Sequence, residues 1–104
     1  MDVVIIVKKV DVVKMTRKIP IISLEDFEAK AKKPVMMKSL VTNIASGIKE
    51  ELESVNIAEI KNYDVIISVP KDEWKSGLEN AMEYYIKTEE YEVCLKIKKL
   101  IEKI

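Results

Sequence analysis

Acidic side chains form three short groups that could hold a divalent metal ion or perform acid–base chemistry. They are Glu25, Asp26 and Glu28; Glu50, Glu51 and Glu53; and Glu89, Glu90 and Glu92. Each group lies among lysines and away from the apolar positions of its predicted helix, so structural or solvating roles explain it better. We therefore expect a protein that is not an enzyme, with no catalytic residue, no metal site and no cofactor.

The sequence also lacks the usual partners of a nucleophile. It contains no histidine, which is the side chain that titrates near neutral pH without perturbation. Its one cysteine, Cys94, occupies an apolar position of a predicted helix, whereas a catalytic thiol needs a basic, partly exposed setting. We expect Cys94 to be a small core residue.

Basic side chains gather near the N-terminus, where they could neutralise the phosphates of a nucleic acid. The cluster consists of Lys8, Lys9, Lys14, Arg17 and Lys18. Residues 1–38 carry nine basic and five acidic side chains, and the remaining residues carry nine and thirteen. Base recognition relies on arginine and stacked aromatics, which are scarce here, so lysines that protect strand edges are the simpler explanation. The uneven charge could also steer a protein partner or a second copy of the chain.

Aromatic side chains are concentrated in the second half of the chain and are candidate contacts for a protein partner. Tyrosine and tryptophan often anchor interfaces because they bury a large area at small entropic cost. We select Trp74, Tyr84, Tyr85 and Tyr91 as candidate partner-binding residues. Tyr84 and Tyr85 point about 100° apart on a helix, so we expect Tyr85 to face the core and Tyr84 to lie at the helix margin or to be exposed. A margin of the intramolecular core is the alternative role for the whole group.

Composition limits the class of protein. The chain has 104 residues, 48% apolar and 35% charged, which suits one domain spanning 1–104. A formal net charge of zero disfavours both a strongly basic nucleic-acid binder and an acidic disordered protein. A single cysteine excludes a disulfide framework. Since neither a signal-peptide pattern nor a membrane-length apolar segment is found, we expect a cytoplasmic protein without membrane contact.

Four segments rich in β-branched residues predict a small sheet. Residues 3–7 are predicted to form a central strand, and residues 10–15 either continue it or form a hairpin with it. Residues 19–22 contain Pro20, which favours an edge strand. Residues 63–69 predict a further strand, closed by a proline.

Two helices are predicted in the first half. Ser23 caps a short helix that ends near Lys33, before Pro34. Apolar residues at three- and four-residue steps predict a second helix over 37–55 that stops at Asn56. Its polar face is predicted to carry Lys38, Asn43, Lys49, Glu50 and Glu53. Gly47 inside this helix costs about 1 kcal/mol relative to alanine, so we expect it to mark close packing.

The C-terminal third predicts a helical hairpin. One helix begins at 70–74, a turn occupies 88–90, and the last helix runs to the C-terminus. The expected core positions are Trp74, Leu78, Ala81, Met82, Tyr85, Val93, Cys94, Ile97, Leu100, Ile101 and Ile104. The fold class is therefore α+β: a small sheet of two to four strands, covered by helices on one face, with a C-terminal αα-hairpin.

Residues 82–101 resemble the UVR-type helical hairpin of bacterial excision-repair subunits and of some protease-adaptor and kinase-partner proteins. The residues that carry the resemblance are Met82, Tyr85, Glu89, Tyr91, Glu92, Val93, Cys94, Leu95, Lys98, Lys99 and Ile101. Leu95 replaces the second small residue of the motif, and Lys98 and Lys99 replace its Arg-Asp pair. The resemblance implies a hairpin that docks onto proteins rather than a catalyst.

These observations predict a small, non-catalytic interaction or adaptor protein that docks through its C-terminal helical pair or its sheet edge. A homodimer is one expected assembly. Phages and mobile elements commonly encode accessory proteins of this size, so such an origin is one hypothesis. The alternative function is a nucleic-acid-associated accessory protein that uses the N-terminal basic cluster.

Overall fold

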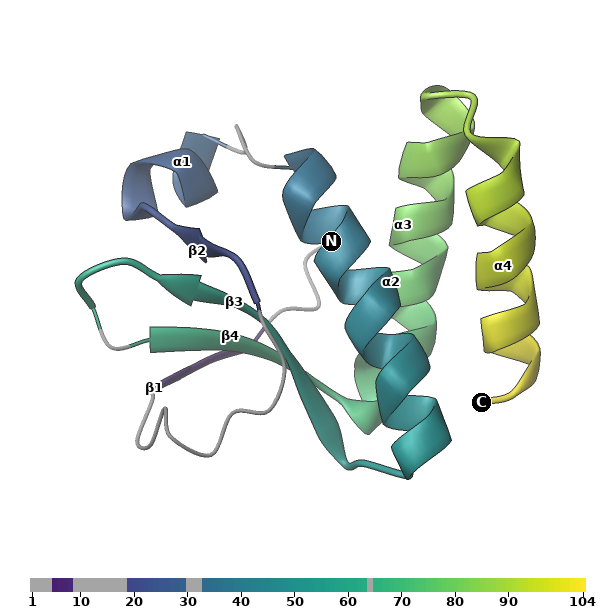
Figure 1. Ribbon diagram of the computed structural model, residues 1–104, viewed down its shortest axis with the longest axis horizontal. Coiled ribbons are helices and arrows are strands. Elements are labelled where there is room, and N and C mark those ends of the chain that lie inside the picture. Colours follow the sequence, from purple (N-terminus) through teal and green to yellow (C-terminus); the bar gives the residue numbers. More distant parts are fainter. Residues whose placement is uncertain (1–4, 9–18, 30–32, 64) are drawn as a thin grey trace.

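The computed structural model describes residues 5–8, 19–29, 33–63 and 65–104, which form a sheet and a set of helices (Figure 1). In chain order, the elements are β1 (Ile5–Lys8), β2 (Ile21–Ile22), α1 (Leu24–Ala29), α2 (Lys33–Glu50), β3 (Ser54–Ile60), β4 (Val65–Pro70), the 3-10 turn η2 (Lys71–Glu73), α3 (Trp74–Lys87) and α4 (Tyr91–Glu102). The predicted α+β class is confirmed. Among the described residues, no helix has the length and apolar character needed to cross a membrane.

The four strands form one mixed sheet in the order β1-β4-β3-β2. β4 pairs antiparallel with both β1 and β3, and β2 pairs parallel with β3. The three long helices lie together on one side of the sheet, and α4 is the outermost (Figure 1). The predicted covering of one face by helices and the C-terminal helical hairpin are therefore confirmed.

The centre of the described sheet differs from the prediction. Residues 3–7 were expected to form a central strand, but β1 lies at an edge and β4 lies next to it inside the sheet. β4 buries four consecutive residues, from Ile66 to Val69, as expected of a strand that is covered on both faces. β2 lies at the opposite edge, as predicted from Pro20, which directly precedes it. Residues 10–15 lie outside the described part of the chain.

The helix predicted over 37–55 ends five residues early. Glu51 has a φ of 58°, and the Leu52 amide donates to the Gly47 carbonyl at 2.9 Å, which caps the end of α2. β3 then begins at Ser54, so Val55 and Asn56 belong to a strand rather than to a helix and its stop. Leu52 and Val55 continue the three- and four-residue spacing of α2 by coincidence, so the sequence pattern did not reveal the start of the strand.

The segment from α1 to the start of α2 agrees with the prediction only in part. The Oγ of Ser23 accepts a hydrogen bond from the Asp26 amide at 3.0 Å, which confirms the cap of α1. The predicted end of α1 near Lys33 is wrong, because Lys33 is the first residue of α2. Pro34 follows in the first turn of α2, where its missing N–H is not needed.

Gly47 lies in close contact with the neighbours of α2, as predicted. A Cβ atom at Gly47 would lie 2.6 Å from Val55 Cγ1 and 2.8 Å from Trp74 Cη2. The indole of Trp74 is 1% exposed, and its Nε1 donates to the Val69 carbonyl at 2.9 Å. The Trp74 ring of α3 therefore packs closely against α2 and is hydrogen-bonded to β4.

A buried polar network joins α2 to β3 and corrects the predicted polar face of the helix. Asn43 is buried, not solvated. Its Nδ2 donates to the Ser39 carbonyl at 2.8 Å and lies 3.1 Å from Ser39 Oγ, which in turn donates to the Ile57 carbonyl at 2.6 Å. Glu53 is likewise not on this helix, because α2 ends at Glu50.

Candidate functional site

The turn between α3 and α4 is built by backbone and side-chain hydrogen bonds at the predicted position. The Glu90 amide donates to the Tyr85 carbonyl at 2.8 Å, and the Thr88 amide donates to the Tyr84 carbonyl at 3.1 Å. Thr88 Oγ1 also lies 2.7 Å from Glu90 Oε2 and 3.2 Å from the Tyr85 carbonyl oxygen. Glu89 adopts a φ of 62° that reverses the chain. These contacts fix the angle at which α4 returns along α3.

The inner face of α4 packs against α3 and the core. Ile97 is fully buried, and Val93, Leu100 and Ile101 pack around it while partly buried. Cys94 is also partly buried, and its thiol lies 3.7 Å from the Met82 carbonyl oxygen. Ile104 was expected on this stripe, but it lies beyond the end of α4 and is exposed.

The outer face of α4 carries large apolar side chains that nothing in the described part of the chain covers. Tyr91 is 59% exposed and Leu95 is 63% exposed. They are four residues apart on one helix and therefore neighbours on the same face. Ile86, at the end of α3, is also half exposed. We call Tyr91, Glu92, Leu95, Lys98 and Lys99 the α4 outer surface.

Charge on α4 is divided along its length. Its start is acidic, whereas its later turns are mostly basic, and all of these charged side chains are exposed. The acidic residues at or just before its start are Glu89, Glu90 and Glu92, and the later basic ones are Lys96, Lys98, Lys99 and Lys103; Glu102, the last residue of α4, is an acidic exception among them. This arrangement complements the helix dipole, which is positive at the N-terminus and negative at the C-terminus.

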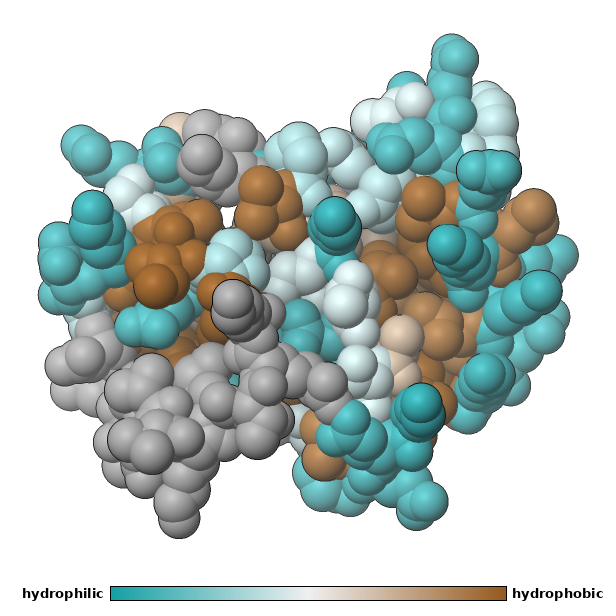
Figure 2. Space-filling view, in the orientation of Figure 1, coloured by the Kyte–Doolittle hydropathy of each residue, from teal (hydrophilic) through white to brown (hydrophobic). Residues whose placement is uncertain are grey.

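Another apolar area lies over the region between α2 and α4 (Figure 2). Both helices carry partly buried apolar side chains that pack against the core, among them Val41, Ile48, Leu100 and Ile101. This area is a margin of the core. The α4 outer surface differs because its apolar residues face away from the buried Ile97.

Two of the four aromatic residues predicted to bind a partner are in the core. Trp74 is fully enclosed and Tyr85 is 7% exposed, so neither can present its ring to a partner in this fold. Tyr84 lies at the core margin, as predicted, with its ring centroid 5.0 Å from that of Tyr85 in an edge-to-face arrangement. The Lys33 Nζ lies 5.6 Å from the Tyr84 centroid, which ties α2 to α3. Of the four residues, only Tyr91 is exposed, with 59% of its surface open to solvent.

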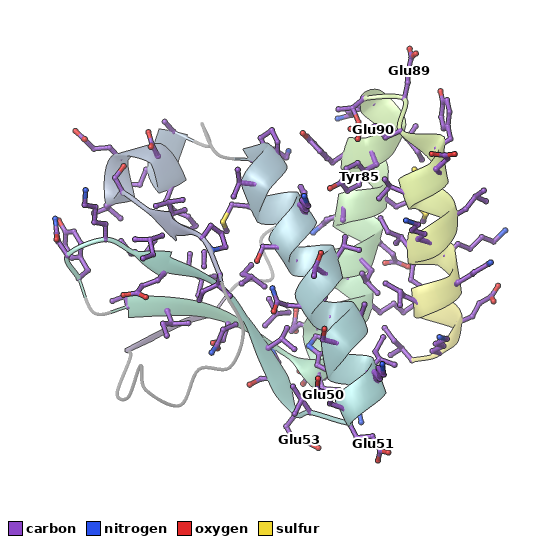
Figure 3. The ribbon with its side chains drawn as sticks, viewed as in Figure 1. Glu50, Glu51, Glu53, Tyr85, Glu89 and Glu90 are labelled. Atoms are coloured by element: carbon purple, nitrogen blue, oxygen red, sulfur yellow. The ribbon has the colours of Figure 1, made fainter. Side chains whose placement is uncertain are left out.

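The environment of Tyr85 favours its neutral form. Burial raises the pKa of the phenol above 10.0, and the nearby Glu90 carboxylate and Tyr84 raise this pKa further. Figure 3 shows Glu90 on the same side of the turn as Tyr85, whereas Glu89 projects away from the end of the hairpin. Tyr85 is therefore not poised to act as a base.

The carboxylate groups do not converge. Glu50, Glu51 and Glu53 lie around the turn that follows α2 and project in different directions (Figure 3). In the described ranges, no three acidic or thiol side chains are placed so that they could hold one metal ion.

The predicted nucleic-acid surface falls mostly outside the described residues. Lys8 is the last residue of β1, in register with Val65 of β4. Lys9, Lys14, Arg17 and Lys18 lie in the part of the chain that is not described.

In comparisons with known proteins, no family model, no curated protein and no solved structure matches this chain.

Proposed function

We propose that this chain is a small, non-catalytic protein-interaction module that docks through its α3–α4 hairpin. The observation that carries the proposal is the pair of large, exposed apolar side chains, Tyr91 and Leu95, on one face of α4. Covering an exposed leucine or tyrosine removes apolar area from water, which contributes roughly 1.5–3 kcal/mol per fully buried side chain. Two such residues at helical spacing are typical of a helix that binds in a groove.

The packing of α4 suits a docking role. Ile97 and the residues around it hold the inner face of the helix, and the hydrogen-bonded turn at Thr88 fixes its direction. The outer surface is therefore presented on a rigid element, and little conformational entropy is lost on binding. The resemblance of residues 82–101 to UVR-type hairpins supports the same role.

The proposal also includes a non-catalytic role and a cytoplasmic location. The lack of histidine and the separated carboxylates support a non-catalytic role. A single, partly buried cysteine suits a reducing compartment, so we place the protein in the cytoplasm. Nucleic-acid binding by the N-terminal basic cluster stays a separate prediction.

Affinity capture from the cells that express the chain tests the proposal. We expect Leu95→Lys to lower the yield of a specific partner by about tenfold, because the loss of one buried leucine exceeds the 1.4 kcal/mol of a tenfold change. Tyr63→Ser is the matched control, since Tyr63 is similarly exposed but lies in the turn after β3. Recovery of the same proteins at the same yield by the wild type and Leu95→Lys would contradict the proposal.

A further inference from the structure

We infer that the partner of the α4 outer surface is a second copy of this chain, bound through an antiparallel pair of α4 helices with a two-fold axis at Leu95. This inference rests on the proposed function, because it uses the same surface. It adds the identity of the partner and the register of the contact.

The division of charge along α4 favours the antiparallel orientation. An antiparallel pair places the acidic start of each helix against Lys96, Lys98 and Lys99 of the other copy, and does so twice; Glu102, at the end of each helix, lies beyond these lysines. A parallel pair would place acid against acid and base against base. Two-fold pairing of this kind is self-complementary and closed, so it ends at a dimer.

The positions around Leu95 give specific pairs. At about 100° per residue, Glu92 and Lys99 lie on one side of Leu95, and Tyr91 and Lys98 lie on the other. In an antiparallel two-fold pair, a residue before Leu95 in one copy meets a residue after Leu95 in the other copy. The two residues lie on the same side of Leu95 and at similar distances from it along the helix. Glu92 then faces Lys99 of the second copy, and Tyr91 faces Lys98 of the second copy. The first contact is an ion pair and the second is a cation–π contact.

The helix dipole alone does not account for this surface. It explains acidic residues at the start of α4 and basic residues near its end. It gives no reason for Leu95, the most exposed large apolar residue of the helix, to occupy the midpoint of the two charge zones. Burial of Leu95 against the same residue of a second copy does account for this position.

The contact is small. α4 has 12 residues and is therefore about 18 Å long, and one such helix pair covers less than the roughly 800 Å² per partner of a standard interface. We therefore expect a reversible dimer with a dissociation constant on the order of 10–100 µM.

Sedimentation equilibrium of the full chain, with charge-reversed variants, tests the pairing. Glu92→Lys alone and Lys99→Glu alone each place like charges together at both copies of the contact, and we expect each to weaken the dimer about tenfold or more. In an equimolar mixture of the two variants, every pair is again of opposite charge, so we expect a heterodimer of about wild-type affinity. Lys38→Glu, an exposed charge reversal on α2, should leave the wild-type affinity unchanged. Thermal unfolding checks that each variant is folded.

Each outcome is decisive. Dimer formation by the wild type and by the mixture, but not by either single variant, supports the inference. A wild type that remains monomeric up to about 1 mM, or a mixture that stays monomeric, overturns it. If capture of a different protein still depends on Leu95 in that case, the proposed function stands and only the self-pairing fails. If that capture does not depend on Leu95 either, both fail.

Discussion

α2 and α4 have similar amphipathic sequences and very different surroundings. α2 buries five residues, including two polar ones, between the sheet and α3. α4 buries only Ile97 and lies outermost, against α3 (Figure 1). The hydrophobic pattern of a helix therefore indicates that one face is covered, but not how much of the remaining surface is free.

We assign different roles to the packed region around α2 and to the α4 outer surface. The contact of α2 with β3 and Trp74 is close-packed and hydrogen-bonded, and we assign most of the stability of the fold to it. The α4 outer surface contributes little to folding, and we assign binding to it. Substitutions in the contact of α2 with β3 and Trp74 should alter the free energy of unfolding. Substitutions on the α4 outer surface should alter association.

Trp74→Ala should have the largest effect on stability. It empties a fully buried ring site and removes the hydrogen bond to Val69, so we expect the free energy of unfolding to fall by about 3–5 kcal/mol. Urea unfolding followed by circular dichroism measures this loss. A decrease below about 1 kcal/mol would show that the ring does not hold α2 and the sheet together.

Gly47→Ala should have the next largest effect. The new methyl group would overlap Val55 and Trp74, at a cost of about 1–3 kcal/mol, and only part of this is offset by the better helix propensity of alanine. Addition of Val55→Ala removes one of the two clashing atoms, so the double variant should lose less stability than the sum of the single variants. Strict additivity in urea unfolding would contradict this packing.

Tyr85 should make a smaller, pH-dependent contribution. Because burial raises the pKa of Tyr85 in the folded protein above 10.0, its contribution is fully present below pH 10 and is lost as the pH rises through the folded-state pKa. Lysines titrate in the same range, so the comparison is with Tyr85→Phe. The wild type should lose more stability than Tyr85→Phe between pH 9 and pH 11. Equal slopes would contradict the raised pKa.

Much of the fold could be predicted because its signals are local. Ser23 is a side-chain cap, and the turn at Thr88 interrupts a clear helical period. β3 was missed because Leu52 and Val55 fall on the helical spacing of α2, so the end of the helix depends on a backbone reversal at Glu51 that residue types do not reveal.

The exposure of the candidate site residues was harder to predict than the fold. The aromatic residue type did not distinguish Trp74, which fills the core, from Tyr91, which faces solvent, because that difference depends on which helix lies outermost. The exposure of Leu95 was not predicted, because this residue was noted only as a departure from the UVR-type motif. Asn43 was assigned to solvent because its partner Ser39 is held in the core by a hydrogen bond to the Ile57 carbonyl of β3, a contact that exists only in the folded chain.

Amide NMR spectra of the full chain, recorded over a range of concentrations, test the separation of the two regions most directly. We predict concentration-dependent shifts centred on Leu95 and extending to Glu92 and Lys99, with the amides of α2 and β3 unchanged. Spectra that do not change with concentration, or shifts centred on α2 and β3, would contradict it.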